Sequence, residues 1–263
     1  MTDTYWYKQA SDKPLFPELA WDKPENMRLA GKLLIIGGNT HGFSALGQAY
    51  QIAQEAGIGV AKVLLPDVLQ KSVGKILENG EFAPSTKSGS FSHTALESWI
   101  SWANWADGTL IAGDLGRNSE TAVVLEKFIT ATAKPLFITK DAIDYFRANA
   151  REVLVRDKTV LILSLSQLQK FCLEIGWTSA VTYKMTTLQL VEFLHNLTSL
   201  NPISIITSHN GNYFVTHKGV VSTTKNAQTD DIWRVEIASK ASVWYIQNPN
   251  KPFESLTSSV FDT

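Results

Sequence analysis

Apolar runs and amphipathic stretches alternate along most of the chain. Residues 32–38, "KLLIIGG", form a short apolar run that ends in two glycines, and residues 43–57 then repeat apolar positions at helical spacing. The same succession continues to residue 176, with strands predicted at 60–66, 108–113, 134–139 and 159–163 and helices at 67–78, 92–106, 119–133, 140–150 and 166–176. Strands that alternate with amphipathic helices predict a mostly parallel sheet with helices on both faces.

The last third of the chain departs from this alternation. Residues 203–208 and 212–223 both have the composition of strands, and His217, Lys218 and Gly219 suit a hairpin turn. An antiparallel edge added to a parallel sheet accounts for this pattern. No stretch resembles a linker between domains, so residues 31–263 are predicted to form one α/β domain.

Residues 1–30 have a different character. They contain three prolines and several aromatic residues but no sustained hydrophobic period. We therefore expect an extended arm that lies on the surface of the domain and packs through Trp6, Phe16 and Trp21.

Composition and charge narrow the function classes. The chain is 44% hydrophobic and 19% charged, which is enough apolar material for a large core. Its formal net charge of −1, without a dense Lys and Arg cluster, argues against nucleic acid and membrane partners. The chain has one cysteine, Cys172, and neither a signal-like start nor an apolar run of bilayer length, so we expect a cytoplasmic protein with a small-molecule ligand. Whether it forms a homo-oligomer stays open.

The loop after the first predicted strand is rich in glycine. It reads "GGNTHGFSA" and contains Gly37, Gly38, Asn39 and Gly42. Parallel sheets bind ligands at the carboxyl ends of their strands, where glycines let backbone amides approach. Two interpretations remain open here, a ligand-binding loop and a plain tight turn between strand and helix.

A second glycine loop, "AGDLGRNSE", follows the strand at 108–113. Gly113 and Gly116 flank Asp114, Arg117 is suited to a phosphate or carboxylate, and Asn118 is a candidate helix cap. The alternative is a capped turn with a solvated arginine.

Two later loops carry further polar candidates. Asp141 follows the strand at 134–139 and is either a helix N-cap or a site carboxylate. His209 precedes Asn-Gly and is more typical of a solvated turn than of a ligand contact. No two histidines have metal-ligand spacing with a carboxylate, so no dedicated metal site is predicted.

Taken in order, these loops resemble those of the carbohydrate-kinase-like NAD(P)H-hydrate dehydratases, a branch of the ribokinase-like superfamily. The resemblance spans about residues 30–247. It rests on residues 31–66, with their strand, glycine loop and Ala-Gly-x-Gly turn. It also rests on "AGDLGRNSETAVVLEKFI", which is similar to a Gly-Pro-Gly-Leu-Gly-Arg segment, and on "KPLFITKDAIDYF", which is similar to a Lys-Pro-Leu strand ending in Asp-Ala-Asp-Ala.

The resemblance implies a ribokinase-like three-layer α/β/α sandwich and a reaction that uses ADP or ATP with Mg2+. In that family the nucleotide activates the hydroxyl of hydrated NADH or NADPH, and an Asp that ends a Gly-Ser-Gly-Asp turn is the base. Here Asp231 takes the position of the base and Thr229 that of the Ser. The resemblance also assigns a nucleotide or NAD(P)-type ligand to a set of loop residues, namely Gly37, Gly38, Asn39, Gly113, Gly116, Arg117 and Asp141.

The sequence departs from the family at the site itself. Asp230 stands where the last glycine of the turn belongs, and two unit charges about 4 Å apart repel by about 4 kcal/mol at an effective dielectric near 20. Residues 164–169, "SLSQLQ", lack the His and Glu of a Pro-His-Pro-Gly-Glu loop. Thr139 replaces an Asp, and Asp114 replaces a Pro.

Three interpretations follow from these departures. The first is a nucleotide-binding protein with lost or altered catalysis, which would need no catalytic cofactor. The second is an active dehydratase with Asp231 as the base. The third is a noncatalytic interaction protein, in which the tryptophans of "WISWANW" would cover an interface, although burial against the sheet explains them as well.

Overall fold

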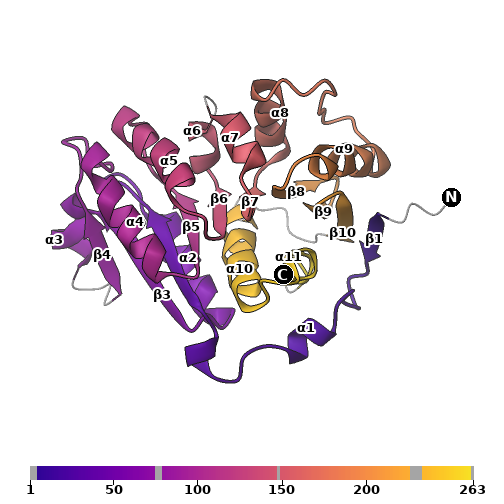
Figure 1. The fold of residues 1–263 in the computed structure, drawn as a ribbon, viewed down its shortest axis with the longest axis horizontal. Coiled ribbons are helices and arrows are strands. Elements are labelled where there is room, and N and C mark those ends of the chain that lie inside the picture. The colour runs from indigo at the N-terminus through magenta and orange to yellow at the C-terminus, as the bar shows by residue number, and fades with distance from the viewer. Residues whose placement is uncertain (1–4, 75–78, 147–148, 226–232, 262–263) are drawn as a thin grey trace.

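The computed structural model describes residues 5–74, 79–146, 149–225 and 233–261 of the chain. Within these residues ten strands form one sheet in the order β1-β10-β9-β8-β7-β6-β5-β2-β3-β4 (Figure 1). The strands are β1 (Trp6–Gln9), β2 (Lys32–Gly37), β3 (Val60–Pro66), β4 (Gly80–Ala83), β5 (Gly108–Gly113), β6 (Leu136–Thr139), β7 (Thr159–Ile162), β8 (Ser204–His209), β9 (Asn212–His217) and β10 (Val220–Lys225).

Helices cover both faces of this sheet. The α-helices are α1 (Glu18–Trp21), α2 (Ser44–Glu55), α3 (Gln70–Val73), α4 (Leu96–Trp105), α5 (Ser119–Ala131), α6 (Ala142–Tyr145), α7 (Ala150–Val155), α8 (Leu165–Glu174), α9 (Thr187–Ser199), α10 (Trp233–Gln247) and α11 (Pro252–Ser259). Three short 3-10 helices accompany them, η1 (Met27–Leu29), η2 (Asp67–Leu69) and η3 (His93–Ala95). None of the helices in the described part of the chain is long and apolar enough to cross a bilayer.

Successive residues of the central strands belong to two separate cores. In β2, Leu34 and Ile36 pack into the core beneath α4, α5, α8 and α9, while Leu33 and Ile35 pack into the core beneath α2 and α10. All four side chains are fully buried. A strand buried on both faces reads as a continuous apolar run, which is the pattern of residues 33–36. The three-layer α/β/α prediction is therefore confirmed.

The antiparallel pairing lies where the sequence predicts it. β9 runs antiparallel to both of its neighbours, β8 and β10. Lys218 and Gly219 join β9 to β10 with φ values of 48° and 80°, and left-handed turn residues of this kind match the twist of a hairpin. The predicted hairpin turn at 217–219 is thus confirmed.

The edges of the sheet contain elements that the hydrophobic pattern does not reveal. β1 pairs in parallel with β10, so the beginning of the chain adds an edge strand next to strand residues from near its end. β4 is a four-residue edge strand beside β3. Neither strand has a clear apolar period, because one or both of its faces lie at the surface. The eight-residue helix α11 was also not among the predicted elements.

The packing of the arm differs from the expectation at one residue. Trp6 donates from Nε1 to Thr223 Oγ1 at 3.0 Å, and the ring of Phe16 contacts Phe253 edge-on with centroids 6.0 Å apart. Trp21, in contrast, is 88% exposed, so its predicted packing is wrong. The reason is helix geometry: α1 buries Leu19, and a residue two positions later points to the opposite side.

The tryptophans of α4 divide between core and surface. Trp99 is fully buried and contacts the rings of Phe91 and Phe128 edge-on, with centroids 4.9 and 5.4 Å apart. Trp102 is half-buried, and Lys62 Nζ lies 4.3 Å from the centre of its ring. Packing within the molecule therefore accounts for Trp99.

The hairpin also generates a pH prediction. His217 lies at the end of β9 with Nδ1 2.8 Å from Ser204 Oγ, and burial, assisted by the charge of Lys218, lowers the pKa of its imidazole to about 4. The unfolded chain has a histidine pKa of about 6.5, so the folded state binds fewer protons between these values. This contribution to stability is present above pH 6.5 and is lost as the pH falls toward 4.

We expect the free energy of unfolding to fall by about 2 kcal/mol between pH 7 and pH 5 because of this group. Urea denaturation at both pH values measures the change. In His217→Gln the fall should shrink by that amount, whereas the exposed His41→Gln should behave like the wild type. An unchanged fall in His217→Gln would contradict the assignment.

Candidate functional site

Three glycine- and aspartate-bearing loops meet at the carboxyl edge of the sheet. They follow β2, β5 and β6, which are adjacent strands in the sheet. The amide of Gly38 donates to the carbonyl of Gly113 at 3.0 Å, which joins the first loop directly to the second. Parallel strands bring their carboxyl ends to one edge, and the sequence therefore locates these loops correctly.

The glycines of the two loops are required by the way the loops pack on each other. A Cβ atom on Gly37 would lie 2.6 Å from the carbonyl oxygen of Gly113. Gly116 has a φ of 68°, and a Cβ there would lie 2.8 Å from Ser90 Oγ and 3.2 Å from Asn39 Cγ. Close packing of loop against loop is thus sufficient to explain these two glycines.

Asn39 ties the first loop to the second. Its Nδ2 donates to the carbonyl oxygen of Asp114 at 2.6 Å, and its Oδ1 accepts from the amide of His41 at 2.7 Å. The side chain is only 7% exposed. Both polar ends of this predicted ligand contact are therefore engaged by the protein itself.

Asp114 occupies the N-terminal end of α2. Its Oδ2 accepts from the amide of Ala45 at 2.9 Å, while Oδ1 accepts from Lys140 Nζ at 2.7 Å. The residue before α2, Phe43, provides no side-chain cap. Helix N-termini attract anions. Here the carboxylate of the neighbouring loop takes that position, so a second anion at the same helix end would meet a negative charge.

Asp141 organises the second loop from the third. Its two carboxylate oxygens accept from the amides of Asp114 at 2.7 Å and Leu115 at 3.0 Å. Burial raises the pKa of this carboxyl, although both amide bonds act in the opposite direction. Asp141 makes no cap bond to α6. Asp141 thus stands at the N-cap position of α6, but its side chain holds the loop after β5 in place and does not cap the helix.

Arg117 and Asn118 end the second loop. Asn118 accepts from the amides of Glu120 at 2.8 Å and Thr121 at 3.2 Å, so it caps α5 as predicted. Arg117 precedes it and is exposed. Asn118 is therefore a structural residue, whereas Arg117 remains a candidate for contact with a ligand.

A polar pair that the sequence does not reveal lies farther along the same edge. Gln167 is the third residue of α8 and forms a capping box with Ser164. It is 7% exposed, and its Nε2 donates to the carbonyl oxygen of Lys140 at 2.7 Å. Its Oε1 accepts from Arg234 Nη1 at 2.9 Å. The half-buried Arg234, in the first turn of α10, is thus positioned between the ends of β6 and β7 by one buried amide.

The Ser-x-x-Gln spacing at 164–167 is a capping signal that predicts the start of α8. Nothing in the spacing links Gln167 to Arg234, 67 residues later.

The turn that resembles the family's catalytic turn lies outside the described residues. This applies to Thr229, Asp230 and Asp231. The structure describes β10 up to Lys225 and α10 from Trp233. Arg234, three positions after Asp231 in the sequence, is therefore described.

His209 is not a solvated turn residue. It ends β8, is 7% exposed, and its Nε2 lies 2.9 Å from the carbonyl oxygen of Met185. Asn210 and Gly211 form the turn instead, with φ values of 47° and 68°. For metals, no group of three or more His, Cys, Asp or Glu side chains among the described residues is arranged to hold an ion.

The two amide bonds of Asp141 lead to a prediction. Asparagine keeps the shape of the side chain but presents an amino group to one of the two backbone amides, which leaves a part-buried donor unpaired. We expect Asp141→Asn to lower the free energy of unfolding by about 1 to 3 kcal/mol in urea denaturation. The exposed neighbour Asp144 provides the control, because Asp144→Asn should change stability by less than about 0.5 kcal/mol. Equal effects in the two variants would rule out this role.

No protein-family model matches the sequence, and no curated protein matches it at the level of sequence. Solved structures do match. A ribokinase-like superfamily protein from Enterococcus faecalis is 13% identical over 99% of this chain and 87% of its own, with a TM-score of 0.72. A hypothetical protein from Streptococcus mutans is 13% identical over 92% and 85%, with a TM-score of 0.70.

A third structure is the ADP/ATP-dependent NAD(P)H-hydrate dehydratase of Bacillus subtilis, co-crystallised with ATP/Mg2+. It is 12% identical over 94% of this chain and 86% of its own, with a TM-score of 0.64. At sequence identities this low, the similarity shows the fold alone. The chain therefore has the ribokinase-like fold.

Proposed function

We propose that this chain is a ribokinase-like nucleotide-binding protein related to ADP/ATP-dependent NAD(P)H-hydrate dehydratases, with lost or altered catalysis. The observation that carries the proposal is the half-buried Arg234, held by Gln167 at the carboxyl edge of a ribokinase-like sheet. A guanidinium is always charged and matches the geometry of phosphate oxygens. Arg234 lies three positions after Asp231, the last residue of the turn that resembles the family's phosphate-binding turn.

The loops after β2 and β5 support a ligand site that differs from the one implied by the family resemblance. Their glycines pack on each other, and Asp114 fills the N-terminal end of α2. We therefore assign the phosphates to the side of Arg234 and Gln167, and not to the α2 end. Of the predicted ligand residues, the exposed Arg117 retains this role, whereas Gly37, Gly38, Asn39, Gly113, Gly116 and Asp141 shape the loops around it.

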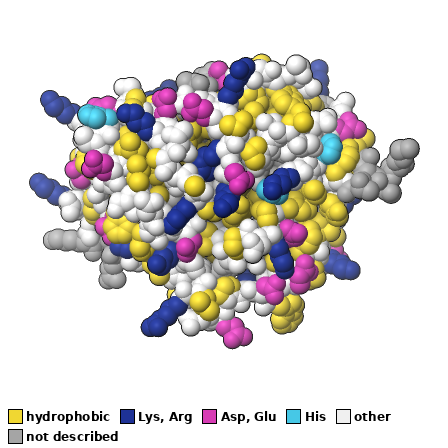
Figure 2. Space-filling model, in the orientation of Figure 1, with side chains coloured by type: hydrophobic (Ala, Val, Ile, Leu, Met, Phe, Trp, Pro, Cys, Tyr) yellow, Lys and Arg dark blue, Asp and Glu magenta, His cyan; other side chains and the backbone are white. Residues whose placement is uncertain are grey.

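A solved structure with the same fold supports the proposed class of ligand, and the charge of the surface is compatible with it. Figure 2 shows Lys, Arg, Asp and Glu side chains interspersed over the face in view, in keeping with a formal net charge of −1. The Bacillus subtilis dehydratase was co-crystallised with ATP/Mg2+. Mg2+ commonly enters such sites with the phosphates and needs one or two carboxylates, so a preformed metal cage is not required. Asp144, exposed beside Gln167, is a carboxylate of this kind.

A thermal-shift screen with ADP, ATP, NADH and NADPH, each with and without Mg2+, tests the proposal. A ligand that binds only the folded state, at about 100 times its Kd, should raise the midpoint by about 5 to 10 °C. Arg234→Ala should lower the affinity for that ligand by about 10- to 100-fold, because it removes a charge-assisted bond to phosphate. Arg28→Ala, an exposed arginine in η1, is the matched control. No shift with any of these ligands would refute nucleotide binding.

A second candidate, an active dehydratase with Asp231 as base, is favoured by the same arginine, since it adds a positive charge four positions after Asp230 in the sequence. In that case hydrated NADH with Mg2+ and ADP or ATP regains NADH absorbance, and Asp231→Asn abolishes the recovery.

If catalysis is lost or altered, NADH absorbance recovers only at the uncatalysed rate in the wild type. In that case Asp230→Gly should raise nucleotide affinity at least tenfold. This follows because about 4 kcal/mol of repulsion is removed. Full recovery in the wild type would overturn the first candidate in favour of the second.

A further inference from the structure

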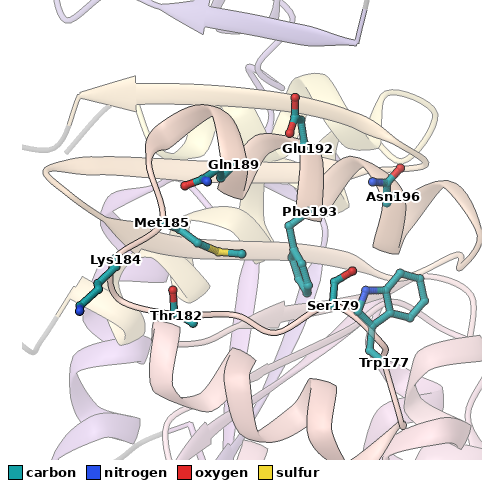
Figure 3. Close-up of a pocket in the computed structure, with 9 residues that line it drawn as sticks. All are labelled: Trp177, Ser179, Thr182, Lys184, Met185, Gln189, Glu192, Phe193 and Asn196. Atoms are coloured by element: carbon teal, nitrogen blue, oxygen red, sulfur yellow. The ribbon is translucent and has the colours of Figure 1, made fainter.

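A cavity of about 440 Å³ lies between α9 and the segment that leads into it, and no residue of the loops after β2, β5 and β6 lines it. Residues 177–185 run alongside the first turns of α9, and the cavity is the space between them (Figure 3). None of its lining residues belongs to the predicted site. Its volume falls within the range of small-molecule pockets.

The segment that forms the outer wall is fixed at three places. The amide of Trp177 donates to the carbonyl of Cys172 at 2.9 Å, which ties the start of the segment to the end of α8. Val181, near its middle, is 2% exposed. At its end the carbonyl of Met185 accepts from His209 Nε2 at 2.9 Å and from Asn210 Nδ2 at 3.3 Å. The cavity is therefore preformed and does not depend on a ligand to order its wall.

The lining has an apolar centre and a polar margin. Figure 3 shows Met185 reaching across toward Phe193, with Trp177 at the other end. Phe193 is 5% exposed, and Trp177 and Met185 are half-buried. Aromatic rings and a thioether are favourable partners for another aromatic ring.

Hydrogen-bonding groups surround this centre. Asn196 contributes a side-chain amide from α9 and Gln189 contributes its Nε2, because the Oε1 of Gln189 accepts from the amide of Thr186 at 2.8 Å. Ser179 and Thr182 contribute hydroxyls from the outer wall. The two charged lining residues, Lys184 and Glu192, have opposite signs and are exposed, and Figure 3 shows their charged ends at the margin. The lining therefore has no net charge to attract an ion.

We propose that this cavity is a second binding site, for an uncharged heteroaromatic molecule that bears amide- or amine-type hydrogen-bonding groups. The ring lies against Trp177, Met185 and Phe193, and the amide of Asn196 and the Nε2 donor of Gln189 recognise its substituents. The site does not depend on the proposed nucleotide function.

The methionines offer a direct probe. The chain has three, and Met185 lines the cavity, whereas Met27 is 65% exposed and belongs to the arm. With methionine methyl groups labelled by carbon-13, Met185→Leu identifies the Met185 signal in an NMR spectrum. Titration with adenosine and with nicotinamide should move that signal through the ring current of the bound heterocycle, while the Met27 signal stays in place and reports the intact fold.

Three variants test whether the probe binds within this cavity. Trp177→Leu should lower the affinity for the probe that binds by about tenfold, since it removes one aromatic contact. If Trp177→Leu fails to fold, Phe193→Leu is the alternative variant, and we expect an effect of similar magnitude. Leu188→Ala, on α9 but outside the lining, should bind normally. No movement of the Met185 signal with either probe would overturn the proposal. So would an affinity unchanged in Trp177→Leu and Phe193→Leu, or binding that is lost in Arg234→Ala.

Discussion

The carboxylate of Asp114 is the contact on which the arrangement of the candidate site depends. It accepts from the first turn of α2 through Ala45 and from Lys140, so it joins the loops after β2, β5 and β6. Its backbone has a φ of 56°, a conformation that an aspartate tolerates better than most residues. Asp141 holds the same residue from the other side by accepting its amide. A proline at this position would lack both the carboxylate and the amide, and it could not adopt a positive φ.

This contact divides the carboxyl edge into two parts. On the side of β2 and β5, hydrogen bonds within the protein satisfy Asn39, Asp114 and Asp141, and the glycines leave no space between the loops. On the side of β7 and α10, Gln167 presents Arg234 near the turn that precedes α10. We therefore place the proposed nucleotide site on the side of Arg234, whose guanidinium has several N–H donors and gives one of them to Gln167.

The sequence predicts the part of this arrangement that depends on local period and on strand order. Residues 33–36 are apolar on both faces, which requires a covered parallel strand, and parallel strands place Gly38 beside Gly113. The sequence could not predict the contact between Asp114 and Ala45, because an aspartate that caps a helix 69 residues away has no local signature. The pairing of Gln167 with Arg234 was missed for the same reason. The edge strand β1 was missed because its residues pair with β10 through backbone bonds that carry no hydrophobic pattern.

The positive charge of Arg234 lies in the first turn of α10 and matters for both functional candidates. A cation in the first turn of a helix opposes the helix dipole and costs about 0.3 to 1 kcal/mol. Two acidic residues, Asp230 and Asp231, precede it within four positions in the sequence, and Gln167 gives its guanidinium a neutral acceptor. A glycine-rich turn attracts phosphate through amides and the helix dipole alone, whereas this chain combines added negative charge with an arginine. Binding of a phosphate here must therefore depend on the arginine to a degree that a glycine turn does not require.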